Sequence, residues 1–577
     1  MLFFKSEMNA DSIKDLFNPA KIEFVIPDYQ RAYSWEKENI QQFIEDILDI
    51  NSYKKQYYLG HFLFERNNNY PDRLLVIDGQ QRLTTVVIFM SCIYYELKNR
   101  LNKNQLSDAD IEEVDVERIK MDFLKYNKFY KLSTVSDDNP FFESVIYNNL
   151  NVRPSNRSQD RIAKAKAQIL DWLVKASSEE IVAYKDIVAE AAISTFEVKG
   201  KFQATQIFAF QNDRGKDLTE LEKLKAEIMH LIYTYSFDDE EATRAVEYVK
   251  TQFSKIFVCV ERFQYTDEDA VLNAHNLAFY PSEQTAVVFL KRGVKDCEKA
   301  SVVEWIKRYT DDILKSYQAM TRIEDKYKYD SKIADIQILD RYNSTPLLLK
   351  LYSFDESDEG FIESVAGLVE RILFKLTFRV DDYRTNRLIS IAREYQGERT
   401  ALTRNLAYIA DKGFKEYWNF NMSCHNYFAE LGNHYNSRIK YVLWKYENAL
   451  RKEKRLSPIS PEYYLNQFGR RKREENTLDH ITPQTPNFTV YSDEFKGMWL
   501  NNIGNLTLMG WGNNAAKSNN SPVADKEFFN TNYLSMQWIY RVLCEKQKWG
   551  EEEIKERLSI LVHFVDNNWI SPMMTGL

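Results

Sequence analysis

Three short segments between residues 477 and 522 constrain the fold of this chain more than any other feature of its sequence. Residues 478–482 alternate enough to form a short strand, and residues 503–509 predict a second strand with glycines as turn residues. Residues 513–517 are expected to open a helix. A strand, a second strand and a helix in this order can hold polar side chains around one small space.

The polar side chains of these segments suit metal-assisted hydrolysis of a phosphodiester. His480 is the candidate general base that takes a proton from water, while Asp479 and the amide oxygen of Asn514 are the candidate metal ligands. Oxygen ligands alone favour Mg²⁺ or Mn²⁺ over zinc. Taken singly, an Asp-His pair is more often structural and an Asn-rich tract is usually a loop. The prediction therefore depends on the three segments together.

A basic stretch lies immediately before these segments. Between residues 438 and 473 there are eleven Lys or Arg against three Glu, although the whole chain has a net charge of −8. The stretch is either a solvated helix face and loop or a contact surface for the DNA backbone, and its position next to His480 favours DNA. The strongest candidates for DNA contact are Arg470, Arg471, Lys472 and Arg473.

A second site is expected near the N-terminus. Residues 74–77 predict a buried strand, Asp78 and Gly79 a tight turn, and the following residues a helix. A glycine turn that feeds a helix presents free backbone N–H groups to an anion. Arg82 and Thr84 would add side-chain donors, and Asp78 could hold a metal or polarise a water. The segment is not a Walker A loop, because it has no GK[ST].

The C-terminal motifs resemble the single-chain form of the GmrSD-type modification-dependent (type IV) restriction endonucleases. DH, GNLTL and NNAAKS follow one another as in the family's His-Me finger (HNH) nuclease domain, a ββα-metal fold, and NNAAKSNNSP is also similar to the HNH domain of RNA-guided CRISPR nucleases. The resemblance makes His480 the base and Asp479 the first metal ligand. It alone selects Asn514 over Asn513 as the second ligand.

The same resemblance implies roles for two further residues of this segment. The central HNH position, which steadies the loop and the histidine, falls on Asn505. Lys517 falls where the family often has a basic residue that faces a DNA phosphate.

IPDYQRAYSW and DGQQR resemble the N-terminal domain of the same family, which has a ParB/sulfiredoxin-like fold and binds and hydrolyses nucleoside triphosphates. Residues 208–218, FAFQNDRGKDL, match its third motif, although without the family such a loop before a helix is an ordinary cap. The aromatic residues of the first motif could equally form a lid on the core. The candidate nucleotide contacts are Arg31, Asp78, Gly79, Gln80, Gln81, Arg82, Thr84, Asn212 and Arg214.

The length and composition indicate several folded domains. At 577 residues, 44% of them hydrophobic, the chain is too long for one core. We expect a mostly helical α+β protein. Its expected parts are a nucleotide-binding domain over residues 1–235 with a helical insertion at about 100–200, a helical connecting region over 236–434 and the nuclease domain over 435–577.

Cysteines and apolar runs indicate where the protein is found. The five cysteines form no CxxC pair, which suits a reducing cytoplasm and argues against a zinc ribbon. The start of the chain lacks the pattern of a signal peptide. Residues 83–95 form the most apolar run, which is shorter than the ~20 residues of a membrane helix and predicts a buried helix. No membrane partner is expected.

Together these features predict a nucleoside triphosphate-regulated, modification-dependent endonuclease or nickase in anti-phage defence. Its expected partners are a nucleotide and double-stranded DNA, in particular modified phage DNA. One metal site cuts one strand, so a double-strand break takes two nicks or a homodimer. Two alternatives stay open: a nucleotide-hydrolysing, DNA-binding switch with weak or no nuclease activity, and a protein that only binds nucleic acid.

Overall fold

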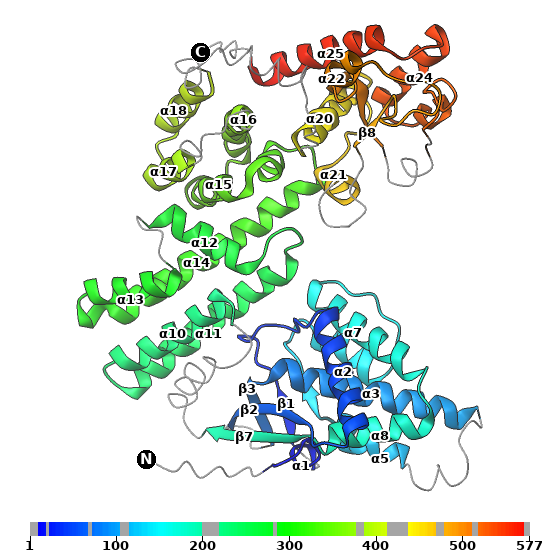
Figure 1. Ribbon diagram of the computed structural model, residues 1–577. Coiled ribbons are helices and arrows are strands. Elements are labelled where there is room, and N and C mark those ends of the chain that lie inside the picture. Colours follow the sequence, from blue (N-terminus) through cyan, green and yellow to red (C-terminus); the bar gives the residue numbers. More distant parts are fainter. Residues whose placement is uncertain are drawn as a thin grey trace. The chain divides into compact units, whose positions relative to one another are not determined.

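The computed structural model describes residues 10–18, 22–66, 72–103, 115–198, 218–280, 285–376, 386–411, 437–468, 478–509, 517 and 519–570. This part of the chain is mostly helical with small sheets, which confirms the expected α+β class (Figure 1). It divides into two compact units. The first comprises Met1–Asn273 and Gln284–Thr321, and the second Ala274–Glu283 and Arg322–Leu577. The boundaries expected at 235 and 434 lie inside these units.

The first unit is built on a five-stranded mixed sheet. Its strand order is β6-β1-β3-β2-β7, and β2 and β3 pair antiparallel, whereas the other neighbours are parallel. The strands are β1 (Glu23–Val25), β2 (Tyr58–Arg66), β3 (Arg73–Asp78), β6 (Leu132–Ser133) and β7 (Ala192–Val198). A separate hairpin consists of β4 (Lys125–Tyr126) and β5 (Phe129–Tyr130).

The described residues around 100–200, where a helical insertion is expected, consist mostly of helices and also contribute strands. They supply β6 and β7, which are the two edge strands of the sheet. The strand β6 is only two residues long, too short to show an alternating pattern. The stretch therefore also completes the sheet of the first unit, a contribution that the sequence did not predict.

Helices cover both faces of this sheet (Figure 1). The buried helix expected at residues 83–95 is confirmed as the central part of α3. Phe62 and Phe64 of β2 belong to the main core, whereas Leu63 between them packs with Ala226 on the opposite face. The helices of the main core are α2 (Lys37–Tyr53), α3 (Gln80–Asn102), α7 (Arg157–Leu173) and α8 (Ser178–Ala189), and Ala226 belongs to α10 (Glu220–Tyr235).

Further helices complete the first unit and pass into the second. They are α1 (Ile13–Phe17), α5 (Val116–Ile119), η1 (Lys120–Leu124), α6 (Asn139–Phe142), η2 (Glu143–Tyr147), α11 (Asp239–Arg262), α12 (Glu268–Phe279), α13 (Ala286–Asp296), η4 (Lys299–Ser301) and α14 (Val302–Asp325). Residues of α12 and of α14 fall on both sides of the division. None of the described helices is long and apolar enough to span a membrane.

The second unit contains a helical part and a small two-stranded sheet. Its elements are η5 (Lys326–Lys328), α15 (Lys332–Asp355), α16 (Glu359–Leu376), α17 (Asn386–Glu394), α18 (Arg399–Asp411), α20 (Ser437–Glu453), α21 (Pro461–Phe468), β8 (Leu478–His480), α22 (Asp493–Met498), η7 (Ile503–Asn505), β9 (Leu506–Leu508), η8 (Lys526–Phe529), α24 (Leu534–Lys546), α25 (Glu551–Val565) and η9 (Asp566–Ile570). Apolar residues of the C-terminal helices pack around Ile481 and Met509.

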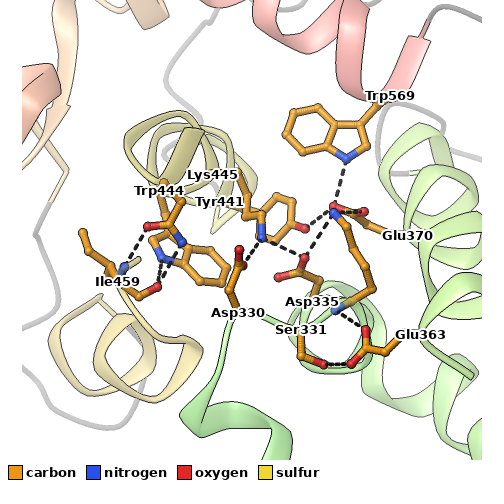
Figure 2. A network of polar contacts seen from close by, with 12 residues as sticks. Asp330, Ser331, Asp335, Glu363, Glu370, Tyr441, Trp444, Lys445, Ile459 and Trp569 are labelled. Atoms are coloured by element: carbon orange, nitrogen blue, oxygen red, sulfur yellow. Dashed lines mark hydrogen bonds and ion pairs between the residues drawn. The ribbon is translucent and has the colours of Figure 1, made fainter. Parts of the chain in front are cut away.

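A buried polar network joins four elements of the second unit (Figure 2). Glu370 of α16 accepts hydrogen bonds from Tyr441 of α20 at 2.7 Å and from Trp569 of η9 at 3.0 Å. Lys445 of α20 donates to Asp335 of α15 at 2.8 Å, and burial raises the pKa of Asp335 to about 6. Because these charged groups are buried, losing one partner would leave an unpaired charge at a cost of about 3–5 kcal/mol. The network therefore fixes α20, which precedes α21 and β8 in the chain.

Candidate functional site

The strands β8 and β9 bring the C-terminal motif residues together. They pair antiparallel, so that Asp479 lies opposite Thr507 and His480 lies opposite Leu506. Both strands are shorter than the expected 478–482 and 503–509. The second strand begins late because residues 503–505 form the 3₁₀ turn η7. The strand pair was predicted correctly, and its extent was overestimated.

His480 has the environment of a neutral base. Its side chain is buried, and its Nε2 lies 3.0 Å from Oδ1 of Asn501. Burial lowers the pKa of His480 below the ordinary 6.5, and the hydrogen bond with Asn501 opposes part of this shift. In the tautomer with the proton on Nε2, this nitrogen donates to Oδ1 of Asn501 and the lone pair lies on Nδ1. The imidazole is thus uncharged at neutral pH, as a general base must be.

Asn505 fixes the segment that follows His480. It is fully buried, and its Oδ1 accepts from the backbone N–H of Thr482 at 3.0 Å and from Nε1 of Trp549 at 3.1 Å. Its Nδ2 donates to the carbonyl of Leu500 at 2.8 Å. Asn505 therefore links the backbone at Thr482, two residues after the candidate base, to the backbone at Leu500.

Arg557 of α25 supports the turn from behind. Its Nη1 donates to the carbonyls of Ile503, Gly504 and Leu506 at 3.2, 3.0 and 2.6 Å. Burial lowers the pKa of this guanidinium to about 10. A Cβ on Gly504 would stand 2.3 Å from the carbonyl oxygen of Ile554, so the turn packs directly on the backbone of α25.

Sequence reasoning missed Asn501 and Arg557. Arg557 left a signal, because it lies three residues after Ile554 and four before Leu561 on the buried face of α25. A charged side chain on the buried face of a helix needs hydrogen-bond partners inside the protein. Asn501 left no such signal, because a single loop amide has no periodicity.

Lys517 lies against the strand that carries the candidate base. Its Nζ is 2.7 Å from Oδ2 of Asp479 and also donates to the backbone carbonyl of His480, and the side chain is only 3% exposed. In the structure its ammonium pairs with the partly exposed carboxylate of Asp479, and a role toward a DNA phosphate stays a prediction.

Several predicted residues lie outside the described part of the chain. They are Asn514, Arg470, Arg471, Lys472, Arg473, Asn212 and Arg214. Among the described residues, no group of three or more His, Cys, Asp or Glu side chains could hold a metal ion. The expected ligand pair of Asp479 and Asn514 is not of that kind, because it contains one carboxylate and one amide.

Two members of the basic stretch have structural roles. Lys445 belongs to the buried network, and Arg451 pairs with the buried Glu447 at 2.9 Å. Glu447 also accepts from the backbone N–H groups of Leu534 and Ser535 at the start of α24. The charge available to DNA from the described part of this stretch is therefore smaller than the sequence count implies.

In the first unit, four of the predicted nucleotide contacts line one hollow, which we call the polar pocket. Arg31, Gln80, Gln81 and Thr84 surround about 230 Å³ together with Thr134 and other residues, and part of this space is open to solvent. Three buried polar atoms here have no hydrogen-bond partner among the described residues: Nε of Arg31, Oε1 of Gln80 and Oγ1 of Thr134. Such atoms call for a ligand with both acceptors and donors.

The two N-terminal motifs are tied to each other at this pocket. Gln81 accepts from the backbone N–H of Ser34 at 2.8 Å and donates to the carbonyl of Ala32 at 3.1 Å. Arg31 pairs with Glu268 at 3.1 Å, which leaves its Nε directed elsewhere. The hydroxyl of Thr84 already donates to the carbonyl of Gln80, so it is not a free donor for an anion.

Among the described residues, the other three predicted contacts do not line the polar pocket. Asp78 pairs with Nε2 of His61 at 3.1 Å, and Arg82 donates to the carbonyl of Leu59 at 3.2 Å. Gly79 has a φ of 88° at the start of α3, and a Cβ there would stand 2.4 Å from the ring of Phe62. The structure therefore divides the predicted set into pocket-lining residues and residues that shape the turn.

Comparison with protein families defines the class as restriction endonuclease. Residues 13–229 match the N-terminal domain of GmrSD restriction endonuclease, and residues 419–564 match the C-terminal domain of GmrSD restriction endonucleases. The two matches cover more than half of the chain, which belongs to the GmrSD restriction endonuclease family. Among curated proteins, none matches it.

Proposed function

We propose that the protein is a nucleotide-regulated, modification-dependent endonuclease or nickase that acts on double-stranded DNA in anti-phage defence. Its family supports DNA cleavage in restriction. The observation that carries the proposal is the neutral, buried His480, held by Asn501 beside the carboxylate of Asp479. We propose that the protein acts in the cytoplasm.

In the proposed mechanism the chain supplies a base and metal ligands. Nδ1 of His480 takes a proton from the attacking water, while Asn501 retains the proton on Nε2. Asp479 and Asn514 would hold Mg²⁺ or Mn²⁺, which supplies charge stabilisation at the scissile phosphate. Asn505 and Arg557 keep the base in place by fixing the backbone around it. In this proposal β8, β9 and residues 513–517 are the ββα-metal unit of the HNH fold.

The polar pocket is the proposed site of nucleotide control. Its unpaired Nε of Arg31 is a donor for a phosphate oxygen, and the unpaired Oε1 of Gln80 is an acceptor for a ligand hydroxyl or amide. In this proposal the sheet of the first unit is the ParB/sulfiredoxin-like domain. Asn212 and Arg214 remain proposed contacts from outside the described residues.

The ion pair of Lys517 with Asp479 favours a second candidate function. An ammonium at 2.7 Å from the proposed ligand oxygen competes with a divalent cation. The alternative is a nucleotide-hydrolysing, DNA-binding switch with weak or no nuclease activity. It predicts intact DNA after prolonged incubation with Mn²⁺, while the nucleotide is consumed.

Paired phage DNAs, modified and unmodified, test the proposal directly. The protein is incubated with each DNA and Mg²⁺, with and without a mixture of nucleoside triphosphates. We expect cleavage confined to modified DNA and a rate that changes with nucleotide. Equal cleavage of both DNAs would contradict modification dependence, and nucleotide consumption without any cleavage would favour the switch.

A further inference from the structure

A second hollow adjoins the polar pocket, and we call it the acidic chamber. It surrounds about 450 Å³, part of it open to solvent, and shares Ala32, Val135 and Asp138 with the polar pocket. Carboxylates from separate segments line it, as does the apolar ring of Phe257. The two hollows therefore share part of their walls. Their combined lining is cationic at Arg31 in the polar pocket and acidic in the acidic chamber.

Two of the chamber's carboxylates are already used by the fold. Asp138 accepts from Nδ2 of Asn156 at 2.9 Å and from the hydroxyl of Ser158. Asp28 accepts from the backbone N–H and the hydroxyl of Ser136 at 2.6 and 2.7 Å. These side chains shape the wall, and their acceptor capacity is largely taken.

Glu261 of α11 differs from these two carboxylates. It is only 9% exposed, and its buried Oε2 has no hydrogen-bond partner among the described residues. The ion pair with Arg161 is long, at 4.0 Å. Burial raises the pKa of Glu261 to about 7. A buried acceptor without a donor costs free energy, so a ligand that brings a donor would remove this cost.

The charge pattern sets the orientation of a ligand that spans both hollows. The acidic chamber repels phosphate, whereas Arg31 in the polar pocket attracts it. The opposite end of a nucleotide carries N–H and O–H donors and an apolar ring face. These groups suit a free carboxylate oxygen beside the ring of Phe257.

We propose that the acidic chamber binds the nucleoside end of the nucleotide, and that Glu261 determines nucleotide preference by accepting hydrogen bonds from a base edge or from the ribose hydroxyls. This inference rests on the proposed nucleotide binding in the polar pocket. It adds a site and a specificity residue that the sequence motifs do not contain.

The test is equilibrium binding to the full-length protein by calorimetry, with GTP, ATP, CTP, UTP and inorganic tripolyphosphate as separate probes. The variants are Glu261→Gln, Glu261→Asp and Glu240→Gln, a control on the exposed face of the same helix. We expect Glu261→Gln to weaken the preferred nucleotide by about tenfold or more, the size of one lost charged hydrogen bond. Tripolyphosphate binding and the control should be unchanged.

Two further probes identify the donor. Weaker binding of the 2′-deoxy form of the preferred nucleotide assigns the ribose hydroxyls, and weaker binding of a form that lacks the base amino group assigns the base edge. In Glu261→Gln, the modified nucleotide and the preferred nucleotide should bind with equal affinity. A melting temperature unchanged in Glu261→Gln or in Glu261→Asp confirms that the variant used is folded.

Other outcomes would overturn the inference. If Glu261→Gln binds every nucleotide like wild type, or weakens tripolyphosphate as much as nucleotides, the acidic chamber is not the nucleoside site. Failure of the proposed nucleotide site in the polar pocket would be recognised by a different result. In that case Arg31→Ala would bind nucleotide and tripolyphosphate like wild type.

Discussion

The side chain of Asn501 decides which nitrogen of His480 carries a proton, because its Oδ1 accepts from Nε2 at 3.0 Å. We expect Asn501→Ala to lower the cleavage rate about 10–100-fold, as for other residues that orient a catalytic histidine or metal ligand. Asn501→Asp keeps an acceptor and should recover part of the rate. Single-turnover cleavage measures the effect, with DNA affinity and melting temperature as controls. A rate unaffected by Asn501→Ala would remove this residue from the site.

His275 of α12 makes the stability of the protein depend on pH. It is fully buried, and burial lowers its pKa to about 3, against 6.5 in the unfolded chain. Between these values the unfolded state binds more protons, so the contribution is complete above pH 6.5 and is lost as the pH falls. Lowering the pH from 7.5 to 5 should cost about 2 kcal/mol of unfolding free energy.

Denaturant unfolding of wild type and His275→Phe at several pH values checks this contribution. Other groups titrate equally in both proteins, so the difference between the two isolates His275. That difference should change by about 2 kcal/mol in favour of the variant as the pH falls from 7.5 to 5. A difference independent of pH would show that His275 is not held neutral.

Single residues were predicted from sequence only where a motif marks them. The sequence placed Asp479 and His480 on one strand, and the structure brings them to the centre of a sheet pair. The pairing of Lys517 with Asp479 could not be predicted, because a linear pattern does not show which side chains meet in space. Glu261 was missed because α11 follows no motif and its partner surface comes from residues more than 100 positions earlier.

At the scale of elements, the turn η7 depends on a glycine at a close contact. Gly504→Ala would place a Cβ 2.3 Å from the backbone oxygen of Ile554, so either η7 or α25 must shift. We expect a loss of about 1–3 kcal/mol in stability and slower cleavage. Thermal unfolding and cleavage of the same preparations measure both effects.

Gly497→Ala is the matched control, because no atom lies within 4 Å of a Cβ at that position in α22. This change should be neutral or stabilise by up to about 1 kcal/mol. If the two alanine variants behave alike, the close packing of η7 on α25 is not what holds the turn.

Elements were predicted best where they are long and periodic. The helix α3 was predicted from its long apolar run, whereas the two-residue β6 and the 3₁₀ turn η7 gave no periodic signal. The edge strands of a sheet are selected by their neighbours in space. For that reason the sheet contribution of residues 115–198 could not be read from local pattern.

At the scale of the whole molecule, the two family matches divide the proposed chemistry between the compact units. The N-terminal match lies in the first unit and the C-terminal match in the second. Arg31 of the polar pocket pairs with Glu268 at the start of α12, a helix whose later residues belong to the second unit. The Nε proposed to bind phosphate therefore belongs to a side chain that also pairs with α12.

The central claim is that His480 is the base of a DNA-cutting site, and one comparison tests it most directly. Cleavage of modified DNA is measured for wild type, His480→Ala and His563→Ala, with DNA affinity determined for each. His563 is an exposed histidine of α25 and serves as the control. We predict that His480→Ala loses cleavage by at least about 100-fold while binding DNA normally, and that His563→Ala cuts like wild type. Wild-type cleavage by His480→Ala would contradict the account.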